Sequence, residues 1–217
     1  MIYKFIRNKI AKTTIFWKYR HIIQPDVWKS YINDSDNIRR NYYSDFMKFH
    51  KLKSIFEYGC GSAPNFIAVK GKLNSFYYYG YDISKKAISI AHKNYGSNIF
   101  HFTANGKKKL MESYLKQNNL NKFDLTIFDR VLYMISEKKI NSFLKTYSSL
   151  LFYVIIDDFY SEIPQWDKEK YILSKNYIKI FSNYGFELID ISDSKIDSST
   201  AKHFAKRIVL KKIINEK

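Results

Sequence analysis

The chain has 217 residues, of which 46% are hydrophobic and 18% aromatic, enough for one globular domain with a buried core. Its formal net charge of +17 is typical of proteins that bind nucleic acid or anionic membranes, yet the lysines are spread along the chain among many Asn, Ile and Tyr, as compositional bias also produces. The single cysteine, Cys60, excludes an intramolecular disulfide, and the longest apolar run, Leu150 to Ile156, is too short to span a bilayer, so we expect a cytoplasmic protein.

Residues 1–52 precede the first predicted strand and are rich in aromatic side chains, which favours a helical segment packed on the following domain over a free tail. From residue 53 onward, short apolar runs alternate with amphipathic stretches. We therefore divide the chain into an N-terminal helical segment, residues 1–52, and one domain, residues 53–217. The predicted strands are Lys53–Tyr58, Phe76–Asp82, Asn98–Thr103, Phe123–Asp129, Leu150–Asp157, Phe186–Ile191 and Lys206–Lys211.

Helical patterns lie between these strands. Ser84 is a typical N-cap for a helix that ends at Gly96, and Ser136 is placed to begin another. The segment Asp167–Tyr184 reads as one further helix, ended by Gly185.

The alternation of strands and helices indicates βαβ units, hence an α/β fold with a doubly wound, mostly parallel, seven-stranded sheet. The last two strands are joined by Ser192–Ala205, which has no helical pattern. We therefore expect the last strand to be antiparallel.

The first strand runs into the stretch FEYGCGSAPN, a turn in which Gly59 and Gly61 allow close approach of the backbone to a ligand. A dinucleotide-binding loop would place its third glycine at position 64, where this chain has Pro64, which lacks the N–H that pyrophosphate needs. Glu57, at the end of the buried strand, suits a ligand that carries an ammonium group and a cationic sulfur better than one that carries phosphates.

This stretch and three later motifs resemble those of the class I S-adenosylmethionine-dependent methyltransferases. In the family's first motif, (E/D)-x-G-x-G-x-G, the positions Glu57, Gly59 and Gly61 match, and Ala63 replaces the third glycine. The form GCGSAPN looks like the GCGSGPN variant of small bacterial methyltransferases, some of which are encoded with polysaccharide genes. The resemblance implies S-adenosylmethionine as cofactor and S-adenosylhomocysteine as product, with Cys60 also in the cofactor loop.

The remaining motifs follow in the family's order. In GYDIS, the resemblance implies that Asp82 accepts hydrogen bonds from the ribose hydroxyls and that Ile83 lies against adenine. In TANG, Asn105 stands where aspartate is usual and would accept from the adenine amino group.

The fourth motif, FDLTIFDRVLYMI, resembles the strand and loop beneath the transferred methyl group. It implies that Asp129 and Arg130 lie at the cofactor and that Tyr133 lies near the reaction centre.

A hydroxyl acceptor needs a general base, which must lie at the carboxyl ends of the strands. His203 is the first candidate because its loop opens on that edge and its ordinary pKa suits base chemistry near neutrality. Asp158 and Tyr133 are the alternatives. The carboxylates Asp129, Asp157 and Asp158 could also bind Mg²⁺, as in catechol-type O-methyltransferases, although we favour a site without metal.

The N-terminal segment is predicted to pack on the cofactor edge as a lid, with Arg39, Arg40 and Tyr43 as candidate lid residues. Its basic start, Lys4–Lys12, could instead rest on a membrane surface.

The function favoured by these patterns is methyl transfer, as O-methylation, to a small-molecule or saccharide acceptor. An RNA or other nucleic-acid methyltransferase is favoured by the charge, but the loop Asp129-Arg-Val-Leu is not the (D/N)-P-P-(Y/F) loop of amino-directed DNA enzymes. A non-catalytic module with the cofactor fold is the third possibility, opposed by the intact Glu57 and Asp82.

Overall fold

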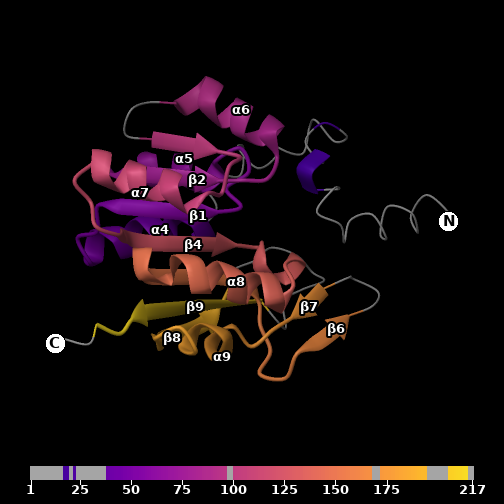
Figure 1. The fold of residues 1–217 in the computed structure, drawn as a ribbon. Helices are drawn as coiled ribbons and strands as arrows, with labels where there is room; N and C mark the ends of the chain where they lie inside the picture. Colours follow the sequence, from indigo (N-terminus) through magenta and orange to yellow (C-terminus); the bar gives the residue numbers. More distant parts are fainter. Residues whose placement is uncertain are drawn as a thin grey trace.

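A seven-stranded mixed sheet runs through the centre of the computed structural model, in the order β3-β2-β1-β4-β5-β9-β8 (Figure 1). The structure describes residues 17–19, 22, 38–96, 100–167, 172–194 and 205–214. The strands are β1 (Ser54–Tyr58), β2 (Tyr77–Tyr81), β3 (Phe100–Thr103), β4 (Phe123–Asp129), β5 (Leu151–Phe159), β8 (Phe186–Asp193) and β9 (Ala205–Lys212).

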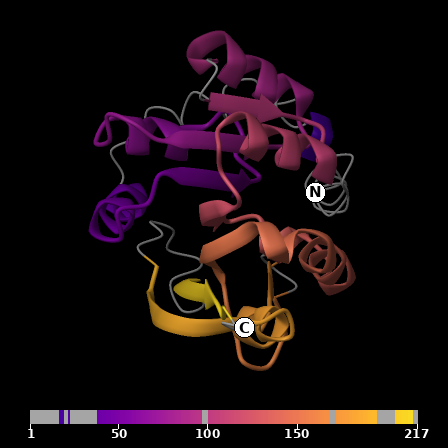
Figure 2. The same ribbon diagram turned by 60° about the vertical axis from the view of Figure 1, so that its left-hand side comes forward.

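Strands β1 to β5 are parallel to their neighbours, whereas β9 is antiparallel to both β5 and β8. The last strand therefore inserts between β5 and β8, as the yellow β9 beside the gold β8 shows in Figure 2. The predicted α/β sheet with an antiparallel last strand is confirmed. The prediction held because each strand is a short run of β-branched or aromatic residues bounded by polar turns.

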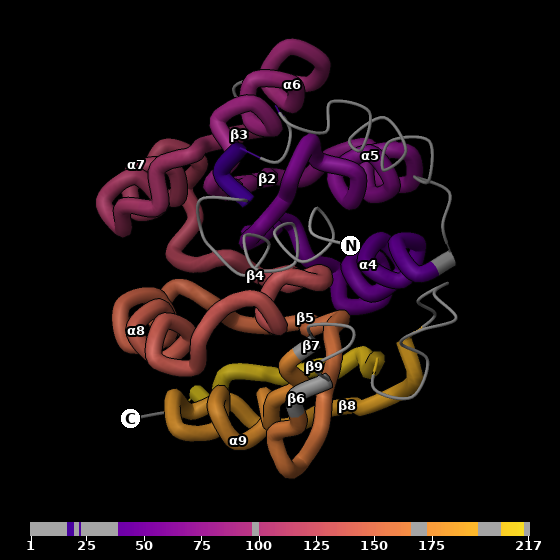
Figure 3. The backbone as a smooth tube through the Cα atoms, turned by 90° about the vertical axis from the view of Figure 1, so that its right-hand side faces the viewer, coloured from indigo at the N-terminus to yellow at the C-terminus, as the bar shows by residue number. Residues whose placement is uncertain are grey.

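Helices cover both faces of the sheet (Figure 3). Those on one face are α4 (Ile38–Phe49), α5 (Pro64–Lys70) and α6 (Lys85–Tyr95), and those on the other are α7 (Lys108–Gln117), α8 (Glu137–Tyr147) and α9 (Tyr177–Ser182). Two short 3₁₀ turns, Leu132–Met134 and Ser148–Leu150, follow β4 and precede β5. Within the described ranges, no helix is both long and apolar enough to cross a bilayer.

The predicted helix starts hold at two positions. The Ser84 hydroxyl accepts from the backbone N–H of Ala87 at 3.3 Å, and Gly96 ends the helix by donating to the carbonyl of His92. Helix α8 begins directly after Ser136, although that serine makes no side-chain cap. Its backbone carbonyl instead accepts the first helical hydrogen bonds.

The single helix predicted over Asp167–Tyr184 is wrong. The structure has a two-stranded arm, β6 (Gln165–Asp167) antiparallel to β7 (Ile172–Ser174), followed by the short helix α9. The reason is local: the side chain of Asn176 accepts from the backbone N–H three residues later at 2.9 Å and so begins the helix there. Periodicity alone did not separate a short strand from a helical turn.

Helix α4 is the part of the N-terminal segment that the structure describes at length. Its Tyr43 and Met47 are buried against the α4–α6 face of the sheet. The basic stretch Lys4–Lys12, for which a membrane contact is predicted, lies outside the described residues.

Phe66 on α5 provides a test of this packing. It is fully buried, with ring centroids at 4.5 Å from Phe100 and 5.1 Å from Tyr78. Phe66→Ala should lower the free energy of unfolding by about 3 to 5 kcal/mol, because it removes apolar burial and leaves a cavity. The matched control Phe49→Ala, at a side chain that is 82% exposed, should change it by less than about 0.5 kcal/mol. Urea unfolding of both variants measures the two changes in the free energy of unfolding. Equal losses would contradict the assignment of Phe66 to the core.

Candidate cofactor and active site

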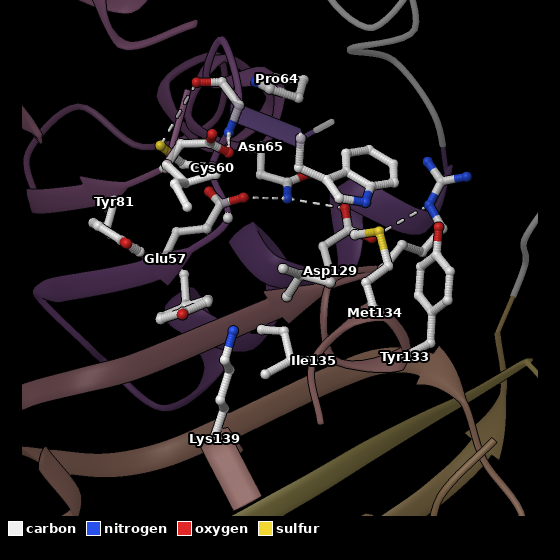
Figure 4. A pocket seen from close by; sticks show the side chains of 18 of the residues that line it. Glu57, Cys60, Pro64, Asn65, Tyr81, Asp129, Tyr133, Met134, Ile135 and Lys139 are labelled. Carbon is white, nitrogen blue, oxygen red and sulfur yellow. Dashed lines mark hydrogen bonds and ion pairs between the residues drawn. The ribbon is translucent and has the colours of Figure 1, made fainter. Parts of the chain in front are cut away.

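A cavity of about 460 Å³ opens at the carboxyl ends of β1, β2 and β4 (Figure 4). Its size lies within the range of sites for small molecules and cofactors, and its place is the edge where parallel α/β sheets bind ligands. Three chain segments form most of its wall. They are the end of β1 with the turn after it, the end of β2 with the residues after it, and the loop of residues 130–135 after β4.

The turn after β1 requires left-handed backbone conformations. Gly59 has φ 81° and Gly61 has φ 55°, and the N–H groups of Gly59 and Cys60 both donate to the carbonyl of Tyr81, at 2.7 and 3.0 Å. A Cβ at Gly59 would lie 2.7 Å from Val131 Cγ2, whereas one at Gly61 would meet nothing within 4 Å. The first glycine is therefore needed for both conformation and close packing, the second for conformation alone.

Ala63 also has a positive φ, 70°, as the N-cap of α5, with Pro64 at the first helical position. Glycine is favoured at such a position because it carries no Cβ, and alanine costs about 1 to 2 kcal/mol there. The departure from the family's third glycine is thus a strained backbone position.

Glu57, the fourth residue of β1, is almost completely buried in the cavity wall. Its carboxylate accepts from Asn65 Nδ2 at 2.8 Å and from the Tyr78 hydroxyl. Burial raises the pKa of Glu57 to about 7, although the hydrogen bond from Tyr78 opposes this shift. A cationic group in the cavity would restore the charged form.

Asp82 follows β2 and has both carboxylate oxygens oriented by backbone N–H groups. One accepts from Gly61 at 2.9 Å and the other from Ser84 at 2.7 Å. A carboxylate oxygen can accept more than one hydrogen bond. Asp82 and its neighbour Ile83 both line the cavity, on its β2 side.

Asp129 ends β4 and is paired with Arg39 from α4, with Asn65 Nδ2 at 3.0 Å and with Arg130 Nε at 3.7 Å. Burial, the largest single effect, acts to raise the pKa of Asp129, but Arg39, Arg130, Arg40 and the hydrogen bond from Asn65 together outweigh it and hold the pKa below its usual value. Asp129 is therefore ionised, and the amide of Asn65 joins it to Glu57.

The three predicted lid residues are all buried. Arg40 lines the cavity and donates from Nε to Asn65 Oδ1 at 3.0 Å, while Arg39 reaches Asp129. The Tyr43 hydroxyl has no hydrogen-bond partner among the residues that the structure describes. Arg40 is thus part of the cavity wall, Arg39 and Tyr43 are packed in the interior, and lid motion stays a prediction.

The loop of residues 130–135 carries Arg130 and Tyr133 to the cavity wall, and their roles stay predictions. Arg130 has φ 50°, and its N–H donates to the carbonyl of Asp157 at 2.9 Å. The ring of Tyr133 meets Phe159 edge-on at 5.1 Å. A non-glycine residue with positive φ beside a cavity is typical of functional sites.

Two predicted site residues, Asp158 and Asn105, lie outside the cavity wall, and two others need separate comment. Asp158 is fully buried, outside the cavity wall, and accepts from backbone N–H groups. Asn105 is exposed after β3, also outside the wall. Cys60 does line the cavity, as a buried thiol whose pKa is raised by burial. His203 lies outside the described residues.

Asp157 and Asp158, two of the carboxylates considered as Mg²⁺ ligands, form hydrogen bonds with different partners. Asp157 accepts from Arg207 Nη2 at 2.8 Å and from the Ser194 hydroxyl, whereas Asp158 holds backbone amides. No group of three or more His, Cys, Asp or Glu that could hold a metal occurs in the described part of the chain.

Sequence reasoning missed Asn65, although it lies inside the quoted motif. The amide group bonds Glu57, Asp129 and Arg40 at once. The available signal was its place in the first turn of the helix after the glycine turn, where a side chain points back toward the strand ends.

The two glycines give a paired test. Gly61→Ala should lower the free energy of unfolding by about 1 kcal/mol from its left-handed backbone alone. Gly59→Ala should lower it by about 3 kcal/mol, because the same strain adds to overlap with the Val131 side chain. Urea unfolding measures both, and losses of the same size would show that Val131 does not pack against Gly59.

No family model matches the chain, and no curated protein matches its sequence. Solved structures do match. Magnesium protoporphyrin IX methyltransferase from Synechocystis PCC 6803, with bound S-adenosylmethionine, is 17% identical over 97% of each chain, with a TM-score of 0.59. The 1,6-didemethyltoxoflavin-N1-methyltransferase of Burkholderia thailandensis, with bound S-adenosylhomocysteine, is 12% identical over 90% of this chain and 89% of that one, with a TM-score of 0.59.

A third structure is the O-methyltransferase from the trans-AT PKS multienzyme of Brevibacillus brevis, in complex with S-adenosyl-L-homocysteine. It is 14% identical over 89% of this chain and 78% of that one, with a TM-score of 0.58. Sequence identities this low support a shared fold and do not by themselves show a shared function. The chain has the fold of the class I S-adenosylmethionine-dependent methyltransferases.

Proposed function

We propose that this chain is an S-adenosylmethionine-dependent methyltransferase that acts on a small-molecule or saccharide acceptor, with a hydroxyl as the favoured methyl acceptor. The observation that carries the proposal is a pair of carboxylates, Glu57 and Asp82, that line one cavity on either side of a glycine turn. One is held in a buried setting that favours a cationic ligand, and the other has its oxygens oriented by backbone N–H groups.

The residues present fit this cofactor. Glu57, with its raised pKa, suits the ammonium group, and the buried guanidinium of Arg40 suits the carboxylate. Asp82 would accept from the ribose hydroxyls, and Ile83 offers an apolar surface to adenine. When bound, the cofactor supplies a methyl group that is already activated for transfer.

The chain's own task is then to position the acceptor and to exclude water. Tyr133 and Met134 line the cavity from the loop after β4 (Figure 4). Trp17 lines it from the N-terminal segment. We retain His203 as the proposed general base and Tyr133 as the alternative. Asp158 is less suited, because its carboxylate already accepts three backbone N–H groups.

The choice of acceptor rests on two further points. The solved structures named above include methyltransferases of a porphyrin and of a toxoflavin precursor, which are small molecules. The likeness of GCGSAPN to enzymes encoded with polysaccharide genes favours a sugar hydroxyl. Screening of metabolite, glycan and RNA pools with labelled cofactor tests this choice, and labelling confined to RNA would favour the nucleic-acid reading that the charge of +17 keeps open.

The cofactor proposal predicts that the protein binds S-adenosylmethionine and S-adenosylhomocysteine but not NAD. Asp82→Ala should weaken binding by on the order of 2 to 4 kcal/mol, because two charge-assisted hydrogen bonds are lost. Calorimetry measures both, with Asp45→Ala as control, since Asp45 is exposed, pairs with Lys72 and does not line the cavity. Binding of NAD, without binding of S-adenosylmethionine, would contradict the proposal.

A pH dependence follows from Glu57. Its pKa is about 7 in the free protein, so the group is partly protonated below pH 7. An ammonium group bound beside it would lower that pKa, so binding releases a proton and affinity rises with pH, by at most about tenfold per unit, up to about pH 7.

Calorimetry with S-adenosylhomocysteine from pH 5.5 to 7.5, in buffers of different ionisation enthalpy, measures this proton release. Glu57→Gln should be weaker throughout and should lose the dependence. An unchanged pH profile in Glu57→Gln would show that another group titrates.

A further inference from the structure

The loop of residues 130–135, which we call the wall loop, forms one side of the cavity. Its side chains Arg130, Val131, Tyr133, Met134 and Ile135 all line the cavity, and Figure 4 labels the last three among the lining residues. Val131 also packs against Gly59 in the cofactor turn. A shift of this loop would therefore change the cofactor turn and the acceptor side together.

The N–H groups of the wall loop are held by one buried carboxylate. Asp158 Oδ2 accepts from Leu132 N at 2.7 Å and from Tyr133 N at 3.2 Å, while Oδ1 accepts from Phe159 N at 2.8 Å. The side chain of Asp158 is completely buried. Its hydrogen bonds are all to backbone donors among the described residues.

The carbonyl groups of the same two residues are held by one buried ammonium group. Lys175 Nζ donates to the carbonyl of Leu132 at 2.9 Å and to that of Tyr133 at 3.2 Å. Lys175 is 2% exposed and follows β7, in the arm that the sequence did not predict. It forms an isolated bridge with Tyr160, which follows β5.

We propose that Asp158 and Lys175 are positioning residues that set the cavity wall by holding both backbone groups of Leu132 and Tyr133. The proposal rests on the proposed function, because it assigns the pair a task at the cofactor site. It also gives the β6–β7 arm a purpose, since the arm delivers the cation.

Two buried charges are a costly way to hold a loop. Removing a carboxylate and an ammonium group from water costs several kcal/mol per ion, and an apolar pair of similar size is often as stable. Charged groups give a stricter geometry, because each ion orients two peptide groups, the carboxylate from one side and the ammonium from the other. This arrangement favours a role in positioning over a role in stability alone.

The alternative roles make different predictions. If Asp158 were a general base for the acceptor, its loss would leave cofactor affinity intact. If the pair were merely structural, its loss would lower stability without a specific effect on the cofactor site. A positioning pair affects the wall loop and cofactor affinity beyond what the loss of stability explains.

The test compares Asp158→Asn and Lys175→Met with the control Asp124→Asn. Asp124 Oδ2 likewise accepts from backbone N–H groups, of Lys53 at 2.8 Å and Ser54 at 3.0 Å. It lies near the start of β4, at the end of that strand away from the cavity. All three substitutions remove a charge that holds backbone groups, but only two act on the wall loop.

S-Adenosylhomocysteine is the probe, and calorimetry gives its affinity at a temperature where every variant is folded. We expect both wall-loop variants to bind it on the order of 10- to 100-fold more weakly, since small displacements in a site have effects of this size. The control Asp124→Asn should bind S-adenosylhomocysteine within about twofold of the unaltered chain. This should hold even if its unfolding midpoint falls by as much as the midpoints of the two wall-loop variants. Equal affinity in all four proteins overturns the proposal.

Hydrogen exchange tests the same proposal without depending on variants that fold. In the unaltered protein, the amides of Leu132 and Tyr133 should be protected to the level of the neighbouring strands β4 and β5, because a buried carboxylate accepts them. Fast exchange at both amides overturns the proposal. If the unaltered protein does not bind S-adenosylhomocysteine, the proposed function fails, and the exchange rates alone then decide the positioning of the loop.

Discussion

The structure around the cavity depends on the pairing of buried charges. Four carboxylates, Glu57, Asp129, Asp157 and Asp158, lie at the carboxyl ends of β1, β4 and β5, with little or no exposure. Carboxylates in such a setting are stable as ions only when paired or hydrogen-bonded. The neighbouring buried cations are Arg39, Arg40, Arg207 and Lys175, which come from α4, β9 and the end of β7.

This pairing explains why elements distant in the sequence must meet at one edge of the sheet. Asp157 accepts from Arg207 at 3.1 and 2.8 Å, which requires β9 to lie beside β5. Arg207 also donates to the backbone carbonyl of Arg39 at 3.2 Å, and its guanidinium lies 4.1 Å from the ring centroid of Tyr42. The insertion of the last strand thus holds helix α4, and α4 supplies Arg40 to the cavity wall.

Backbone strain gathers around the same cavity. Gly59, Gly61, Ala63 and Arg130 all have positive φ and belong to the two turns beside it. The cost of such conformations is acceptable only where the surrounding structure holds them in place. Here the carbonyl of Tyr81 holds the first turn, and the carbonyl of Asp157 holds the N–H of Arg130. The cavity is therefore largely preformed for a ligand that needs close approach to the backbone.

The strands, the glycine turn and the places of Glu57 and Asp82 at strand ends follow from the amino-acid sequence alone. These features are local, because a strand follows from a short apolar run and a turn from glycine and proline in fixed places. Asp82 was identifiable because it directly follows a predicted strand, and the carboxyl ends of parallel strands share one edge. The same local logic predicted one helix over Asp167–Tyr184, where the structure has an arm and a short helix.

The partners of each buried charge, in contrast, are set by the three-dimensional fold. Asp158 had the same sequence context as a catalytic carboxylate, but its neighbours in space are the amides of Leu132 and Tyr133 and the ammonium group of Lys175. Asn65 joins Glu57, Asp129 and Arg40, which lie far from one another in the chain. Spacing along a sequence encodes local geometry, whereas a buried ion is assigned its role by whichever partner the fold brings within hydrogen-bond distance.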